Sequence, residues 1–179
     1  MTTNDIKKRI LFDKDKDACF LTYNILIILD FFNCYNIENS FNDYRKLSYL
    51  VDFASSDVLT NIIAKWGSPT QNEKMQLRNS YINASSRQNR IYLVLQALQN
   101  KGIVHLVLNK QDILKNKLFI DESNKNLIEP ITNKIYFKYE YENLRNFNNT
   151  SSIRGVKTYK FTTLLNQIYE QNGVKVWET

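Results

Sequence analysis

Residues 85–121 read SSRQNRIYLVLQALQNKGIVHLVLNKQDILKNKLFID, and this stretch decides the fold that the sequence predicts. Ser85 and Ser86 are good N-cap residues, because a side-chain hydroxyl can accept from the free amides of a first helical turn. Gly102 suits the left-handed residue that often ends a helix. Between these signals, apolar side chains recur at the spacing of one helix face, at Ile91, Val94, Leu95 and Leu98. The pattern therefore predicts a helix that begins near Ser86 and stops before Gly102.

The same stretch continues as a hairpin. The run Ile103 to Leu108 is apolar and rich in β-branched residues, which is typical of a buried strand. A polar loop from Asn109 to Lys117 separates it from Leu118 to Ile120, which can return as the partner strand. A helix that leads into a hairpin is the second half of a winged helix. The alternative is an ordinary helix and hairpin in another fold, which would give the same sequence pattern. We expect an α+β, mostly helical fold, namely a winged helix (helix bundle plus β-hairpin wing) with a C-terminal strand and helix extension.

The chain divides into three predicted segments. Residues 1–17 form a polar N-terminal arm, residues 18–122 the winged-helix domain, and residues 123–179 a C-terminal extension that packs on it. Further helices are predicted by apolar spacing at Ala18–Asn33, Asp43–Ala54, Asp57–Trp66, Thr70–Asn83 and Lys160–Asn172. Apolar side chains at alternate positions, Ile135, Phe137, Tyr139 and Tyr141, predict a half-buried strand in the extension.

Composition restricts the class of protein without choosing a function. The 179 residues include 24 Lys and Arg against 18 Asp and Glu, a formal charge of +6. A basic chain can favour nucleic acid, but the charges are interspersed and fit an ordinary surface equally well. The apolar run Phe20 to Phe32 contains Asn24 and Asp30 and is too short to span a bilayer. With no signal-peptide pattern, we expect a cytoplasmic protein with no membrane partner.

The sequence shows no catalytic or metal-binding constellation. Cys19 and Cys34 are the only cysteines, and they lie at opposite ends of one predicted helix, too far apart to bridge. We expect them to be reduced, buried thiols. His105 is the only histidine and falls in the apolar strand, so a nucleophile would lack a base elsewhere. We therefore expect a protein that is not an enzyme and needs no metal or cofactor.

Double-stranded DNA is an open alternative partner. Winged helices read bases near the start of the recognition helix, and the wing touches phosphate. The candidate DNA contacts on the helix are Arg78, Arg87, Asn89 and Arg90, and those on the wing are Lys110, Lys115 and Lys117. Arg and Asn can contact bases in bidentate fashion, but the same residues also suit a solvated face.

Two helices carry more apolar residues than one stripe requires, which makes them candidates for a partner interface. The alternative is that these helices are central to the core. The candidate interface residues are Leu26, Ile27, Phe31, Phe161, Leu165, Tyr169 and Trp177.

The order of elements resembles a known family. A long apolar helix (LTYNILIILDFF) leads to a short helix (DYRKLSYLVDFASS), and a later helix ends in a glycine stop (IYLVLQALQNKGIV) before the hairpin. From Ala18 to Ile120 this is similar to the small middle components of three-component ABC systems. In those bacterial systems an SMC-like or Rad50-like ATPase works with an effector, as in Lamassu-type anti-phage defence. The resemblance carries no catalytic motif and leaves residues 122–179 unassigned.

The resemblance implies a non-catalytic adaptor in anti-phage or anti-plasmid defence. Such a subunit would bridge a coiled-coil ATPase and an effector such as a nuclease, and could help to grip DNA. The kite subunits of SMC complexes, also built on winged helices, are a neighbouring family. A free-standing transcriptional or replication regulator of phage or plasmid origin is the alternative, and a small enzyme is a third hypothesis.

Overall fold

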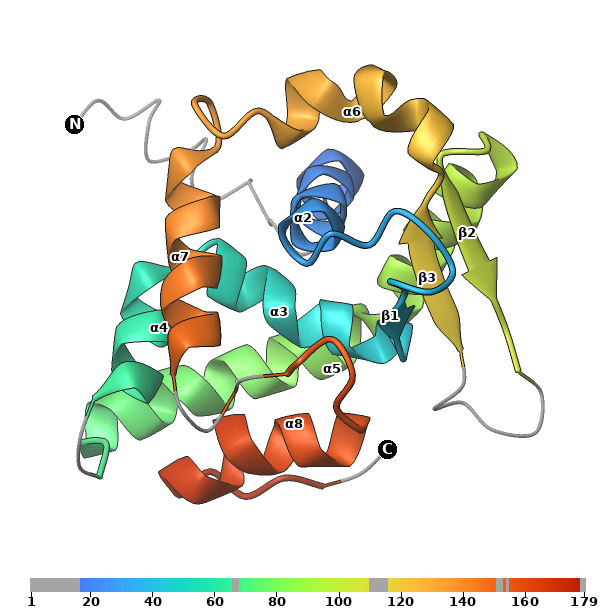
Figure 1. Cartoon of the computed structure of the whole chain (residues 1–179). Helices are drawn as coiled ribbons and strands as arrows, with labels where there is room; N and C mark the ends of the chain where they lie inside the picture. The colour runs from blue at the N-terminus through green and yellow to red at the C-terminus, as the bar shows by residue number, and fades with distance from the viewer. Residues whose placement is uncertain (1–16, 66–67, 110–115, 151–152, 154, 178–179) are drawn as a thin grey trace, which may run out of the picture.

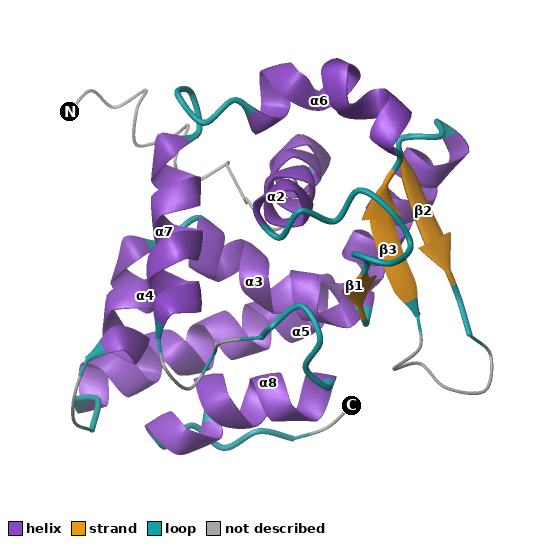
Figure 2. Ribbon diagram, in the orientation of Figure 1, coloured by secondary structure: helices purple, strands orange, loops and turns teal. Residues whose placement is uncertain are grey.

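The computed structural model describes residues 17–65, 68–109, 116–150, 153 and 155–177. Mostly helical, it places three strands together at one side of the helices (Figures 1 and 2). The α+β class predicted from the sequence is therefore confirmed. The elements are α2 (Ala18–Phe31), β1 (Phe41–Asn42), η1 (Tyr44–Lys46), α3 (Leu47–Ala54), α4 (Asp57–Ala64), α5 (Gln71–Asn100), β2 (Val104–Val107), β3 (Lys117–Ile120), η3 (Glu122–Asn124), α6 (Lys125–Thr132), α7 (Lys138–Asn149), α8 (Phe161–Ile168) and η4 (Glu170–Asn172).

Helix α2 occupies the centre of the molecule. The Asp17 carboxylate caps it by accepting from the amides of Cys19 and Phe20 at 2.8 and 3.1 Å. Figure 1 shows α2 end-on, with α6, α7, α3 and the sheet around it. Leu26 and Ile27 are fully buried. Helix α2 is apolar on most faces because it is covered on most faces, as expected of a central helix.

Helix α5 is the longest element and begins earlier than predicted. Thr70 and Glu73 form a capping box at its start, the reciprocal arrangement that satisfies two free amides. Ser85 and Ser86 are not caps but lie in the middle of the helix, and the Ser86 hydroxyl donates to the Asn83 carbonyl at 2.9 Å. The two helices predicted over 70–83 and from 86 are therefore one helix of 30 residues.

The predicted end of α5 and the hairpin after it are confirmed. Gly102 has φ +70°, and the Ile103 amide returns to the Leu98 carbonyl. Strands β2 and β3 pair antiparallel, with His105 opposite Phe119. The short strand β1 joins the free edge of β3, which gives the sheet order β1-β3-β2.

The strand predicted at residues 135–141 is wrong. Phe137 precedes α7, and Tyr141 lies four residues later, so both turn toward the core while Ile135 and Tyr139 are exposed. A period of two and a helical i, i+4 pair coincide at these positions, so the alternation alone could not separate strand from helix. All strands in the described part of the chain precede Asp121, and the extension is helical.

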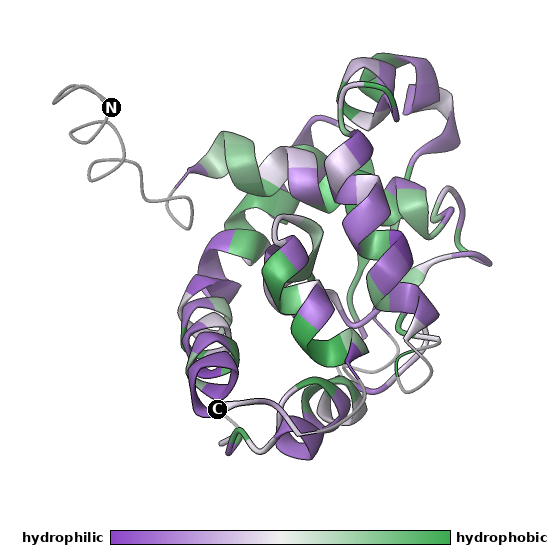
Figure 3. Ribbon diagram, turned by 90° about the vertical axis from the view of Figure 1, so that its left-hand side faces the viewer, coloured by the Kyte–Doolittle hydropathy of each residue, from purple (hydrophilic) through white to green (hydrophobic). Residues whose placement is uncertain are grey.

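The C-terminal helices share one core with the rest of the chain. Buried side chains of α7 and α8, such as Phe147 and Leu164, belong to the same cluster as Ile25 of α2. Most helices carry both hydrophobic and hydrophilic residues (Figure 3), as expected when one face packs inward. The buried Lys46 ammonium connects the start of α3 to the segment before α8. It donates to the carbonyl groups of Val156, Lys157 and Tyr159 at 2.7, 3.0 and 2.9 Å.

Candidate functional site

The outer face of α5 is the longest exposed surface on one element. Met75, Ile82 and Leu93 are 57, 43 and 61% exposed. They are separated by seven and eleven residues, two and three helical turns, so they lie along one line that we call the outer stripe. At about 1.5 Å per residue the outer stripe is roughly 27 Å long. The inner face of α5, which includes Leu77, Tyr81 and Leu95, is buried.

Cations and amides, rather than carboxylates, flank the outer stripe. Glu73 is the only acidic residue in α5. Its carboxylate already accepts from the Lys65 ammonium and from Thr70, and these hydrogen bonds lower its pKa to about 2. Arg78 and Asn89 are both exposed, and their separation of eleven residues places them on the same side of the helix. Arg90 is exposed as well, on a neighbouring side. The outer face of α5 therefore has a positive sign.

Arg87, proposed from the sequence as a DNA contact, is buried instead. Its guanidinium donates to the Asp52 carboxylate at 2.8 Å and to the Ser48 carbonyl at 3.1 Å. The Ser80 hydroxyl donates to the other Asp52 oxygen at 2.8 Å. Because Arg87 is 1% exposed, it joins α5 to α3 and cannot reach a DNA backbone from this position. The sequence alone could not show that Arg87 lies on the inner face of its helix, whereas Arg78 and Arg90 are exposed.

Of the three lysines predicted to contact DNA from the wing, the structure describes only Lys117. Lys110 and Lys115 lie outside the described residues. Lys117 is half-buried on β3, and its ammonium donates to the Ile37 carbonyl at 3.4 Å. His105 is exposed on β2, where its Nε2 lies 2.9 Å from the Asp121 carboxylate.

Most of the predicted partner-interface residues belong to the core. Leu26 and Ile27 are covered on α2, and Phe31 is half-buried against the same cluster. Three further members of the predicted interface, on and after α8, are also buried, because their side chains turn toward α3 and α5. They are Phe161, Leu165 and Tyr169. Tyr169, for example, contacts the rings of Tyr49 and Tyr81. Trp177 differs, because it is 45% exposed.

Trp177 lies beside a groove that the sequence analysis did not anticipate. This tail groove has a volume of about 650 Å³ and runs between the first turns of α5 and the segment after η4. It is lined by Gln71, Lys74, Met75, Arg78, Gly173, Val174, Lys175 and Trp177. Among the described residues, the lining thus contains three cations and no carboxylate. It brings together Arg78 and Trp177, which the sequence had placed in two different candidate sets.

The segment after η4 is held in place by specific contacts. The Trp177 amide donates to the Tyr81 hydroxyl at 3.1 Å, and that hydroxyl donates to the Trp177 carbonyl. The two rings meet edge-on, with centroids 5.2 Å apart. Gly173 has φ +76°, and the position of a Cβ there would lie 3.1 Å from Lys74 Cε. Glycine thus permits both the turn and the close passage of the Lys74 side chain.

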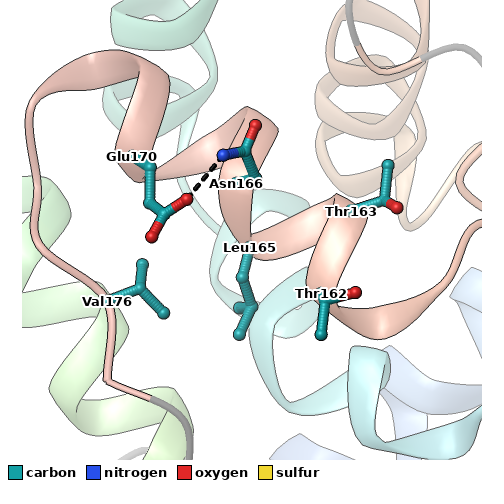
Figure 4. Close-up of a pocket in the computed structure, with 6 residues that line it drawn as sticks. All are labelled: Thr162, Thr163, Leu165, Asn166, Glu170 and Val176. Carbon is teal, nitrogen blue, oxygen red and sulfur yellow. Dashed lines mark hydrogen bonds between the residues drawn. The ribbon is translucent and has the colours of Figure 1, made fainter.

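A second, polar pocket lies on the other side of this segment, against α8 (Figure 4). Its volume is about 490 Å³, and its lining includes Thr162, Thr163, Asn166 and Glu170. The Asn166 amide donates to the Glu170 carboxylate. The carboxylate makes this pocket different in sign from the tail groove.

An apolar groove of about 550 Å³ lies between α2, the end of α5 and α6. Leu98, Ile103 and Ile128 form part of its lining, and Leu127 at its edge is exposed. Among the described residues that line it, Lys101 alone is charged. The apolar groove has the character of a protein-binding surface rather than of a site for charged ligands.

The described residues offer little reactive chemistry. Burial raises the pKa of the Cys34 thiol to about 12, so the nucleophilic thiolate is not populated near neutral pH. Cys19, expected to be buried, is exposed at the start of α2. Among the described residues no group of three or more His, Cys, Asp or Glu side chains could hold a metal ion. Nor does any described helix combine the length and apolar character needed to cross a membrane.

Comparison of the chain with protein-family models, with curated proteins and with solved structures finds no match.

Proposed function

We propose that the chain is a non-catalytic winged-helix adaptor subunit of an assembly that contains an SMC-like ATPase. The element order supports the winged helix. A helical core, α2 and α3, is followed by α5, and α5 leads directly into the β2–β3 hairpin. Strand β1, from the segment after α2, completes a three-stranded sheet. Helix α4 is an addition between α3 and α5.

The outer stripe of α5 is the observation that carries the adaptor proposal. Met75, Ile82 and Leu93 are exposed apolar side chains aligned on one side of α5, with polar residues between them. Single exposed apolar side chains are normal on a surface, so it is their alignment along one helix that supports an interaction site. The stripe of Met75, Ile82 and Leu93 suits a partner helix, which would lie along α5 and bury all three side chains. The cations beside the stripe favour a partner helix with acidic flanks. The coiled coil of an SMC-like ATPase can supply such a helix, with charged residues beside its apolar seam.

The test is co-purification with the products of neighbouring genes, analysed by size-exclusion chromatography with light scattering. The wild-type chain should co-elute with the ATPase. Ile82→Glu and Leu93→Glu should abolish co-elution, because each places a charge inside the interface. Ile135→Glu is the matched control, since Ile135 is 83% exposed and lies between α6 and α7. Elution of the wild-type chain alone in the presence of the ATPase would contradict the proposal.

Contact with double-stranded DNA is the second candidate function, and the sign of the α5 surface favours it. No carboxylate follows Glu73 on α5, while Arg78, Asn89 and Arg90 are exposed. These residue types can reach phosphates or base edges. Arg78 lies about two turns from the start of α5, and Asn89 and Arg90 lie in its middle. Contact through all three would place α5 lengthwise against the DNA.

DNA contact is tested by titrating duplex DNA at a series of salt concentrations. Each lost phosphate contact should reduce the magnitude of the slope of log affinity against log salt by about 0.9. Arg90→Gln is therefore expected to flatten the slope, and Arg145→Gln, an exposed cation on α7, should not. A DNA affinity that is equal in both variants and the wild type would exclude α5 as the contact surface. A dimer that prefers a palindrome would instead support a free-standing regulator.

A further inference from the structure

We propose that the tail groove binds a nucleotide whose base is unstacked, held by its phosphate and by the Trp177 ring. Two sources share this chemistry, a single strand of nucleic acid and a free nucleotide. The inference does not depend on the ATPase partner or on duplex contact through the middle of α5.

Charge is the first observation behind this site. Lys74 and Arg78 come from α5, and Lys175 comes from the segment after η4, so two separate parts of the chain bring three cations to one groove. Within the described part of the chain none of the three forms an ion pair. The one acid nearby on α5, Glu73, is already held by Lys65 and Thr70. A groove lined by three cations attracts an anion.

The exposed indole is the second observation. Bases of single strands stack on aromatic side chains, and a basic groove follows the backbone beside them. Trp177 combines an exposed ring with a fixed backbone, since both its amide and its carbonyl bond to the Tyr81 hydroxyl. Tyr81 itself is buried on the inner face of α5. The ring is thus anchored by the core while part of its surface remains open to a ligand.

The shape of the groove is the third observation. Its volume of about 650 Å³ lies within the range of small-molecule sites, about 300–1,000 Å³. Met75 adds an apolar, polarisable side chain to the lining beside the cations. A groove with cations, one aromatic ring and an apolar side chain matches a phosphate, a base and a sugar better than it matches a protein helix. The polar pocket on the other side of the same segment carries Glu170 and does not offer this combination.

The site predicts a defined dependence on salt. For single strands, log affinity falls by about 0.7 per phosphate contact for each unit of log salt. A strand that brings three phosphates to the groove, one to each cation, gives a slope of about −2, whereas a single nucleotide offers one phosphate to all three cations. Arg78→Gln and Lys175→Gln should each reduce its magnitude by about 0.7.

The probe is a short fluorescein-labelled oligothymidylate, titrated against the full chain and followed by anisotropy. Trp177→Leu should weaken binding about tenfold or more, because stacking on an aromatic side chain contributes that factor per base. Trp177→Phe should retain most of the affinity, since it keeps a ring for stacking. Arg145→Gln, which makes the same change of charge on α7, should bind as the wild type does.

A spectroscopic readout separates stacking from a change in folding. The chain has two tryptophans, so a Trp66→Phe background leaves Trp177 as the only one. Its fluorescence should be quenched when the oligothymidylate binds. If Trp177→Leu does not fold, the Arg78→Gln and Lys175→Gln titrations and this quenching still test the site.

Thymidine monophosphate, used as a competitor, distinguishes the two sources. If thymidine monophosphate displaces the oligothymidylate at about the concentration at which the oligothymidylate itself binds, the ligand is a free nucleotide. If far more thymidine monophosphate is needed, the ligand is a single strand. Leu93→Glu, whose position lies about four helical turns from Arg78 on α5, should leave oligothymidylate binding intact, so loss of the ATPase partner and failure of this site are separable. Binding that is unchanged in a folded Trp177→Leu variant, or weakened equally by Arg145→Gln and Arg78→Gln, would overturn the inference.

Discussion

Replacing Arg87 by methionine should destabilise the chain strongly, because the change leaves a buried carboxylate without its charge partner. Arg87 and Asp52 are 1 and 2% exposed and pair at 2.8 Å between α5 and α3. Removing one member of such a pair costs about 3–5 kcal/mol. In a domain of this length 1 kcal/mol lowers the melting temperature by roughly 2–4 °C, so we expect a decrease on the order of 10 °C. Urea denaturation followed by circular dichroism measures the free energy of unfolding directly.

A double-mutant cycle identifies the pair as the cause. Asp52→Asn removes the second charge but keeps an oxygen for the Ser80 hydroxyl, which donates to Asp52 at 2.8 Å. The double variant Arg87→Met/Asp52→Asn should be more stable than the sum of the single changes by about 2 kcal/mol. Arg90→Met, on the exposed side of α5, should cost less than about 1 kcal/mol. An Arg87→Met variant as stable as the wild type, yet weaker in DNA binding, would refute the structural role and restore Arg87 as a contact.

Three further substitutions test the fold. Lys46→Met should lower the free energy of unfolding by about 2–4 kcal/mol, because three carbonyl groups lose their donor. Burial lowers the pKa of Lys46 to about 7, below about 10.4 in the unfolded chain. The unfolded state therefore holds more protons between these values, and the wild type should gain stability relative to Lys46→Met as pH rises from 7 toward 10, measured by urea denaturation at several pH values. Thr70→Ala should cost about 1 kcal/mol through loss of the cap on α5, and Thr70→Ser should recover most of it. Gly173→Ala should cost at least about 1 kcal/mol at φ +76°, and wild-type stability in thermal melts would contradict that reasoning.

Local signals in the sequence determined several elements correctly. The apolar face that includes Ile91, Val94 and Leu98, with Gly102 after it, fixed the end of α5, and the β-branched run fixed strand β2. These features depend on neighbours in the chain, because caps, turns and helix faces are set within a few residues. The predicted strand at residues 135–141 failed because Phe137 and Tyr141 satisfy two periods at once, and only their packing against the core selects the helix.

The sequence by itself determined the class of fold and the hairpin after α5. Only the tertiary structure decided which side chains are exposed and which are buried. Leu26 and Ile27 became core because α2 is surrounded, and Arg87 became an internal ion pair because Asp52 faces it from α3. The tail groove likewise joins Arg78 to Trp177 across 99 positions of the chain. Exposure and proximity depend on contacts between distant segments, and no spacing within one segment records them.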